Sequence, residues 1–259
     1  AGKTTTVEIL EGFRTRSSGS VTVLGIDPNN GDSAWRNRIG IVHQNSQDAG
    51  DLSVAETVHH FAKYYQNSRN ADEVISAVGL DEKRGSLIRN LSGGQRRRLD
   101  VALGIIGNPE LLFLDEPTNG LDPAGIQEVR DLLEKLASEG VTVFVSSHLL
   151  SELEMISKYL VMLRKGEVIF AGPIEELLYR NKPTIIAKPS SINSLPYLAE
   201  LINKTGHQAI IESDHVRVDA DESFAVTLNK IAFEGGIVLA QLTPVRASLE
   251  ETFFELTGG

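Results

Sequence analysis

Two adjacent carboxylates, Asp115 and Glu116, end a short apolar run that begins at Leu111. Four apolar residues are too few for a stable helix, and such a run is typical of a strand buried on both faces of a parallel sheet. Ligands of α/β proteins bind at the carboxyl ends of these strands. Because neighbouring carboxylates resist joint ionisation, the pair predicts a nearby cation, such as the magnesium of a nucleotide. The alternative is a strand that simply ends in an acidic turn.

The first residues of the chain predict a phosphate-binding loop. Residues 1–6 match the second half of the pattern G-x-x-x-x-G-K-[ST]. From Gly2 onward, backbone N–H groups at a helix N-terminus would face the phosphates. We expect Lys3 to reach the β- and γ-phosphate oxygens, Thr4 to place its hydroxyl on magnesium, and Thr5 to donate to the α-phosphate. A Gly-Lys-Thr triplet alone is common in surface turns, and its combination with the carboxylate pair favours the phosphate loop.

A second helix start with glycines lies in the middle of the chain. The helical pattern runs from Arg96 to Leu103, and the residues before it are Ser92, Gly93, Gly94 and Gln95. The hydroxyl of Ser92 can cap this helix. The serine and the glycines therefore predict a second anion site at a helix N-terminus.

Together these segments resemble the nucleotide-binding subunit of an ATP-binding-cassette (ABC) transporter. Five motifs follow the order and spacing of that family: the phosphate loop, Gln44 after the strand Ile39–Val42, the signature at residues 91–95, the segment 115–118 with the loop 120–122, and His148 after the apolar run 141–147. The match covers roughly the first two-thirds of the chain closely.

The resemblance implies that ATP and Mg²⁺ are the cofactors and that ATP is hydrolysed. Glu116 would be the general base that activates water, and His148 and Gln44 would complete the catalytic site. Magnesium would be held by Thr4, Gln44 and Asp115. Each of these roles comes from the family's motifs.

The resemblance also implies two partners. In the family, two subunits meet head to tail, so that Ser92, Gly93, Gly94 and Gln95 of one subunit close on the nucleotide held by Lys3 of the other. We expect a homodimer, and a heterodimer with a related subunit stays open. A separate membrane-spanning permease would complete the transporter, with this subunit peripheral on the cytoplasmic face of the cell membrane. Residues 248–257 resemble the tail of many prokaryotic export ATPases, which favours export over import. The transported substrate cannot be read from this chain.

The expected fold is α/β: a P-loop NTPase core with a mainly parallel sheet and an inserted helical subdomain, followed by a small ferredoxin-like α+β domain. The cassette domain is predicted at residues 1–180, its helical subdomain at about 45–107, and a regulatory or dimer-bracing domain at 184–259. Within the core, residues 19–25 are expected to form a short strand. Ser53 is expected to begin a helix with a capping box.

Composition narrows the possible partners. The net charge of −10 argues against nucleic acid as the main binding partner, because binding to its phosphates needs a basic face. The strongly basic cluster Arg96-Arg97-Arg98 is predicted to be a solvated helix face. No apolar run reaches the roughly eighteen residues of a membrane span, so the chain is not expected to cross a membrane by itself. The absence of cysteine excludes disulfides and thiolate metal sites.

Two other functions stay open. A cassette ATPase that acts on ribosomes or DNA would usually carry two cassettes or long coiled or basic insertions, and this chain shows neither. A regulatory module that only binds nucleotide would tend to lose the base or the histidine, whereas Glu116 and His148 are both present. Because the chain begins within the phosphate loop, we expect a truncation there, with the adenine-stacking residue upstream of Ala1.

Overall fold

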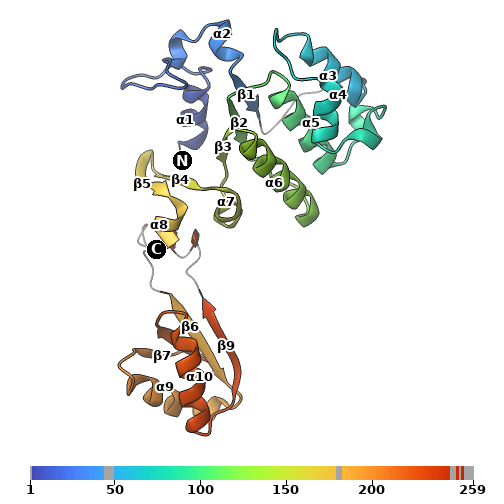
Figure 1. The fold of residues 1–259 in the computed structure, drawn as a ribbon. Coiled ribbons are helices and arrows are strands. Elements are labelled where there is room, and N and C mark those ends of the chain that lie inside the picture. The colour runs from blue at the N-terminus through green and yellow to red at the C-terminus, as the bar shows by residue number, and fades with distance from the viewer. Residues whose placement is uncertain (1, 44–49, 179–182, 246–248, 251, 254–259) are drawn as a thin grey trace. The chain divides into compact units, whose positions relative to one another are not determined.

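The computed structural model describes residues 2–43, 50–178, 183–245, 249–250 and 252–253 (Figure 1). The chain forms two compact units, one of residues 1–156 with 163–167 and one of residues 157–162 with 168–259. The domain limits of 1–180 and 184–259, and the helical subdomain at about 45–107, stay predictions.

A three-stranded parallel sheet lies at the centre of the first unit. Its strands pair in the order β1-β2-β3, and they are β1 (Ile39–Val42), β2 (Leu111–Asp115) and β3 (Thr142–Ser146). Leu114 of β2 pairs with Val42 on one side and with Val145 on the other. The apolar runs predicted as strands therefore form one parallel sheet, since strands without polar alternation are stable only when both faces are covered.

Helices cover both faces of this sheet. Phe113 of β2 packs on one face with α1 (Lys3–Leu10) and α2 (Ser33–Arg36). Its neighbours Leu112 and Leu114 point to the opposite face, where α5 (Gly93–Ile105) and α6 (Pro123–Ser138) pack. The helix that begins at Lys3 and the helix that begins after Ser92 therefore lie on opposite faces of the sheet.

The helix α5 approaches β1 more closely than most side chains allow. A Cβ atom at Gly40 would lie 2.1 Å from the carbonyl oxygen of Gly104, so only glycine fits at position 40. This close contact fixes α5 against the end of the strand that leads to residue 43.

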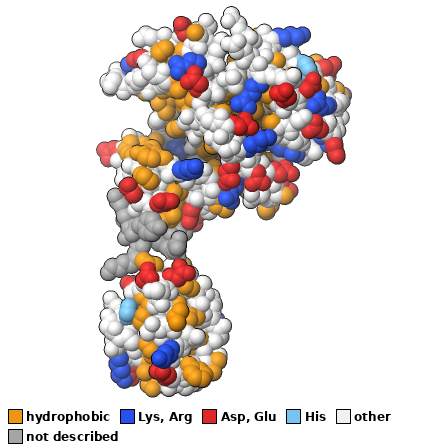
Figure 2. Space-filling view, viewed as in Figure 1, with side chains coloured by type: hydrophobic (Ala, Val, Ile, Leu, Met, Phe, Trp, Pro, Cys, Tyr) orange, Lys and Arg blue, Asp and Glu red, His pale blue; other side chains and the backbone are white. Residues whose placement is uncertain are grey.

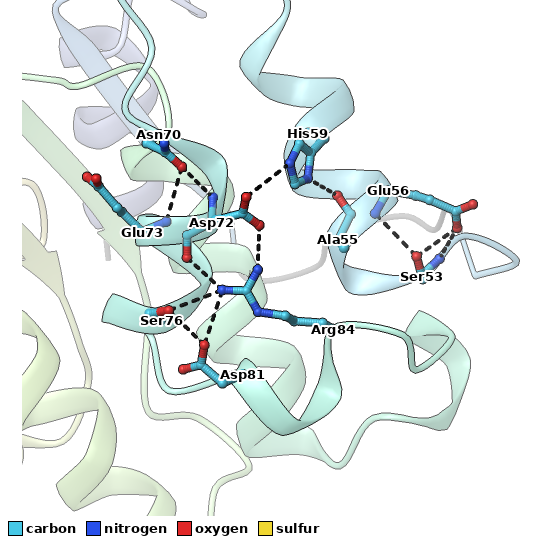
Figure 3. Close-up of polar contacts among 10 residues, drawn as sticks. All are labelled: Ser53, Ala55, Glu56, His59, Asn70, Asp72, Glu73, Ser76, Asp81 and Arg84. Atoms are coloured by element: carbon cyan, nitrogen blue, oxygen red, sulfur yellow. Dashed lines mark hydrogen bonds and ion pairs between the residues drawn. The ribbon is translucent and has the colours of Figure 1, made fainter.

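Capping and polar contacts fix the helices α3 (Val54–Ala62) and α4 (Ala71–Ala77), as Figure 3 shows. Ser53 and Glu56 form the predicted capping box at the start of α3. The ring of His59 donates from Nδ1 to the carbonyl oxygen of Ala55 (2.9 Å), and its Nε2 lies 3.8 Å from the carboxylate of Asp72 on α4. These contacts join the two helices on their exposed side.

Arg84 closes the loop that follows α4 (Figure 3). Its guanidinium donates to the carboxylate of Asp72, to the hydroxyl of Ser76 (3.1 Å) and to the carboxylate of Asp81 (3.1 Å). One side chain thus joins α4, through Asp72 and Ser76, to Asp81 in the segment after it, and this keeps the polar segment in a defined conformation.

Basic and acidic side chains are mixed on the surface. Figure 2 shows one face of the molecule, on which Lys and Arg side chains lie among Asp and Glu side chains. Arg130 and Arg98 illustrate this mixing, because they pair with Glu134 and Glu128 of α6.

The predicted strand at residues 19–25 is wrong. Only an isolated bridge between Val23 and Ile26 forms there, with Leu24 and Gly25 in the left-handed region at φ 50° and 82°. A strand needs a neighbour to take its hydrogen bonds, and here the chain turns back on itself instead.

The remaining elements between the sheet and the C-terminal strands are α7 (Leu150–Ile156), β4 (Tyr159–Arg164), β5 (Glu167–Pro173) and α8 (Ile174–Leu178). Short 3₁₀ helices are Pro28–Asn30, Asp81–Lys83, Ile88–Asn90 and Ile192–Ser194. The β4–β5 turn has Lys165 and Gly166 at positive φ, which suits a two-residue hairpin. Among the described residues, no helix combines the length and the apolar character needed to cross a membrane.

The C-terminal strands form a separate antiparallel sheet in the second unit. The elements follow one another as β6 (Thr184–Pro189), α9 (Leu195–Asn203), β7 (Ala209–Ile211), β8 (Val216–Asp219), α10 (Phe224–Glu234) and β9 (Leu239–Val245), with strand order β7-β8-β6-β9. Ile185 and Ala187 of β6 are fully buried with Leu198 of α9 and Leu228 of α10. This is the expected ferredoxin-like arrangement.

Candidate functional site

Lys3, Glu116 and His148 meet at the carboxyl end of the parallel sheet. Lys3 Nζ donates to one oxygen of the Glu116 carboxylate (3.3 Å), and Nδ1 of His148 lies 2.5 Å from the other oxygen. Lys3 opens α1, Glu116 follows β2, and His148 comes shortly after β3. Parallel strands place their carboxyl ends at one edge, which explains why such distant residues meet.

The backbone of Glu116 has an unusual conformation. Its φ of 52° lies in the left-handed region, which residues with a Cβ rarely adopt. Its N–H donates to the carbonyl oxygen of Ser146 (2.9 Å), and this bond extends the pairing of β2 and β3 by one residue. Its side chain is only 14% exposed. A strained residue held by its surroundings in this way is common at functional sites.

Asp115 lies beside Glu116 with a partner of its own. Its carboxylate accepts a hydrogen bond from the hydroxyl of Ser146, its neighbour on β3. The described residues contain no group of three His, Cys, Asp or Glu that could hold a metal. Mg²⁺ takes oxygen ligands and is often held by one or two carboxylates together with phosphates and water. The Asp115 carboxylate at this edge is of the ligand type that such a magnesium ion takes, and its pairing with Thr4 in a magnesium site stays a prediction.

The N-terminus of α1 fits a phosphate. Gly2 precedes the helix with φ 101°, and no side chain caps the first turn. The side chains of Thr4 and Thr5 in that turn are exposed. Uncapped N–H groups at a helix start are donors that an anion can satisfy. The phosphate-binding roles of Gly2, Lys3, Thr4 and Thr5 stay predictions.

The signature residues form a second, separate helix start. Ser92 and Gln95 make a capping box, in which the Ser92 N–H donates to the Gln95 side chain (3.1 Å) and the Gln95 N–H donates to the Ser92 hydroxyl (3.3 Å). Ser92 and Gly93 are exposed, whereas Gly94 is half-buried. Because α5 packs on the sheet face opposite α1, the structure does not bring these residues to Lys3 of the same chain.

Two predicted features lie outside the described residues. Gln44, expected at the catalytic and magnesium site, belongs to the segment 44–49 that is not described. Of the expected export-type tail at 248–257, only residues 249–250 and 252–253 are described. Both stay predictions.

The predicted solvated face at Arg96-Arg97-Arg98 is wrong for Arg97. This side chain is buried, at 7% exposure, and it donates to the carbonyl oxygens of His43, Asp115 and Pro117. A helical pattern could have revealed it, because Arg97 shares the buried stripe of α5 with Val101.

Glu152 is a second residue that sequence analysis missed. It lies on α7, is 7% exposed, and accepts hydrogen bonds from the hydroxyls of Thr118 and Ser147 (3.4 Å for Ser147). The Ser147 hydroxyl also accepts from the N–H of Leu149 (3.0 Å). Glu152 therefore ties the loop after Glu116 to the segment that carries His148. No sequence signal distinguishes it from the other acids of that helix.

Glu11 is a buried carboxyl group near the site. It is 5% exposed, and its Oε2 has no hydrogen-bond partner among the described residues. Burial, and to a smaller extent the charges of Asp115 and Glu8, raises the pKa of Glu11 to about 7 from its usual 4.5. At neutral pH this group is therefore partly protonated.

Glu11→Gln tests this burial through the pH dependence of stability. A carboxyl pKa raised in the folded state stabilises the fold below about pH 4.5 and loses that contribution as pH rises to about 7. We expect the variant to gain up to about 3 kcal/mol of unfolding free energy relative to wild type between pH 4.5 and 8. Urea unfolding across this range measures the difference, with Glu134→Gln as an exposed control. A difference between Glu11→Gln and wild type that does not change with pH would contradict the burial effect.

Comparison with known proteins gives a consistent result. Residues 1–119 match the family described as ABC transporter. The bacitracin transport ATP-binding protein BcrA of Bacillus licheniformis is 34% identical over 262 aligned positions, which cover all of this chain and 86% of that protein. The Nod factor export ATP-binding protein I of Cupriavidus pinatubonensis is 35% identical over 69% of this chain and 56% of its own length.

A solved structure supports the same relationship. CbiO1 from Clostridium perfringens, part of the ABC transporter complex cbiONQ, superposes with a TM-score of 0.61 at 26% identity. The match covers 69% of this chain and 75% of that one.

Proposed function

This chain belongs to the ATP-binding subunits of ABC transporters, which are ATPases coupled to transport, and from that premise we propose that it drives export through a separate membrane subunit. The observation that carries the hydrolysis part of the proposal is the meeting of Lys3, Glu116 and His148 at one sheet edge. These are the groups that phosphoryl transfer to water requires: a phosphate-binding cation, a base and a polar partner for the base.

The nucleotide is proposed to bind between two copies of the chain. Lys3 and the signature residue Ser92 begin helices on opposite faces of one sheet. Ser92 also lies five positions before Arg97, and thus about 7.5 Å of helix beyond the strand ends that Arg97 contacts. An exposed anion site that projects past its own sheet is suited to a phosphate held by a second copy. Two copies related by a two-fold axis would then close two such pockets at once.

Each residue has a defined role in this pocket. Lys3, with the first-turn N–H groups of α1, would bind the phosphates. Glu116 would orient and deprotonate the attacking water, and His148 would fix the carboxylate and contact the γ-phosphate. Asp115 and Thr4 would hold magnesium, which neutralises charge on the phosphate oxygens. Gln44 is proposed to link this site to the membrane subunit.

The ion pair between Lys3 and Glu116 suggests how the site responds to nucleotide. Lys3 Nζ donates to the carboxylate of Glu116. A triphosphate carries more negative charge than the Glu116 carboxylate and would compete with it for the Lys3 ammonium group. One oxygen of Glu116 would then be released to accept a proton from water, so the base would become active only when its substrate is bound.

Export is proposed from the relatives rather than from the site. Two of the relatives are named for bacitracin transport and for Nod factor export. The described residues hold no helix that could span a membrane, so the path for the substrate would come from a permease on whose cytoplasmic face this subunit sits. We expect the permease to select the substrate.

Inverted membrane vesicles test the direction of transport. Vesicles carrying the full-length protein and its membrane partner expose the ATPase to added ATP. Export predicts ATP-dependent accumulation of a labelled peptide such as bacitracin, several-fold above vesicles with Lys3→Ala. Accumulation that requires no ATP, or loss of preloaded peptide on adding ATP, would contradict export by this subunit.

A further inference from the structure

Arg97 is a buried cation that contacts three backbone carbonyl groups in two separate segments of the chain. It lies on α5, and its side chain is only 8% exposed. Nε donates to the carbonyl oxygen of Pro117 (3.0 Å), Nη1 to that of His43 (2.9 Å), and Nη2 to that of Asp115 (2.8 Å). Every nitrogen of the guanidinium is therefore engaged with a backbone oxygen.

These carbonyl groups lie where the strands end. The pairing of β1 with β2 stops at Val42 and Leu114, so the carbonyl oxygens of His43 and Asp115 are one position beyond it. Carbonyl groups at this edge of the β1–β2 pairing can take a donor from outside the sheet. Arg97 supplies it, and the helix that carries the signature thereby closes the carboxyl ends of two neighbouring strands.

The contacts also surround the candidate base. Asp115 and Pro117 are the residues immediately before and after Glu116. Arg97 thus holds the backbone on both sides of the one residue in this turn that has the left-handed φ of 52°. The N–H of Glu116 is held separately by Ser146. The strained conformation is fixed from three directions, which is the condition under which such strain persists.

Only arginine suits this position. Its planar guanidinium points five N–H donors in fixed directions, whereas a lysine ammonium is a single compact centre. Among the described residues, the carboxylate that pairs with Arg97 is that of Asp100, 3.9 Å from Nη1, so this pairing is weak. Burial lowers the pKa of Arg97. Burying this charge costs desolvation free energy, and its main hydrogen-bond acceptors are uncharged carbonyl oxygens. The role of Arg97 is therefore better explained by its hold on the backbone than by an ion pair.

We propose that Arg97 is a positioning residue for ATP hydrolysis, which couples the signature helix α5 to the backbone of the base Glu116. The inference rests on the proposed function, because it takes Glu116 as the base. When a phosphate binds at the N-terminus of α5 and shifts this helix, Arg97 transmits the shift to residues 115–117 and to His43, the residue before Gln44. In this proposal Arg97 acts through the backbone carbonyl groups that it contacts.

Turnover and binding, measured separately, test this role in the full-length protein. Arg97→Met keeps the length and apolar stem of the side chain but removes all donors. We expect its kcat to fall about 100-fold, because a displacement of about 1 Å at a reacting group has that effect. The Kd for ATP should stay within about threefold of wild type, since the phosphate-binding residues of α1 are untouched. Arg130→Met, on an exposed arginine of α6, should change neither quantity.

A second variant and a double variant complete the test. If Arg97→Met is not recovered as a folded protein, Arg97→Lys decides, with an expected loss of kcat of at least about tenfold at unchanged Kd. Arg97→Met combined with Glu116→Gln should turn over ATP no more slowly than Glu116→Gln alone, because residues that act through one group are not additive.

Two results would overturn the proposal. One is a kcat within about twofold of wild type in a folded Arg97 variant. The other is a loss of ATP affinity in proportion to the loss of kcat, which would indicate a general structural role. If Glu116→Gln itself keeps its turnover, the proposed function fails. If Glu116→Gln loses turnover but the folded Arg97 variants keep it, the proposed function stands and only the role proposed for Arg97 is wrong.

Discussion

Glu116→Gln is expected to lower ATP turnover by about three orders of magnitude while ATP still binds. Glutamine keeps the size of the side chain, but its amide cannot take a proton from water, and general base catalysis typically contributes 10²–10⁴-fold. The change also removes the ion pair with Lys3 (3.3 Å), which leaves Lys3 free for phosphate, so the affinity for ATP should be equal or higher.

Single-turnover hydrolysis of radiolabelled ATP measures this loss, and calorimetry measures the affinity. The matched control is Glu134→Gln, which neutralises an exposed glutamate paired with Arg130 on α6 and should leave turnover unchanged. Turnover of Glu116→Gln close to that of wild type would show that Glu116 is not the base.

Ser92→Phe is expected to abolish turnover although Ser92 lies on the face of the sheet opposite Lys3. Ser92 is exposed and caps α5 through Gln95. A phenyl group there would fill the space in which the phosphate of a second copy is proposed to lie. The expected loss is more than about 100-fold, because an interaction with the transferred phosphate is removed and the closed pocket cannot form.

Ser53→Phe is the matched control for this variant. Ser53 also opens a helix with a capping box, through Glu56 on α3. Loss of a cap costs about 1 kcal/mol of stability in either place. If both variants kept the turnover of wild type, or lost it equally, the signature would have no specific role in the pocket.

The central sheet and its site were predictable because buried parallel strands leave a strong pattern. The run from Leu111 ends in Asp115 and Glu116, and the run before His148 ends at the same edge. Parallel strands place those ends at one edge, so Glu116 and His148 were expected at the same edge, whereas their side-chain contact is given by the structure. The helix starts at Lys3 and Ser92 were also predictable from the sequence, because serine caps a helix N-terminus and glycine before a helix leaves backbone N–H groups open to an anion.

Other features were hidden because they depend on contacts that sequence does not specify. Arg97 belongs to a run of three arginines that suggested solvent, yet it falls on the same stripe of α5 as Val101 and is buried. Glu152 resembles any helical glutamate until Thr118 and Ser147 are placed against it. The strand expected at residues 19–25 had suitable residues but no neighbouring strand.

Co-expression of two inactive variants tests the shared pocket most directly. In a mixed dimer of Lys3→Ala and Ser92→Phe, one pocket combines an intact Lys3 from one copy with an intact Ser92 from the other. If the pocket is shared, turnover should recover to about a quarter of wild type for independent pockets, because half of the dimers are mixed and each has one intact site. If mixed dimers are isolated through two different tags and remain as inactive as each variant alone, the nucleotide is not held between two copies.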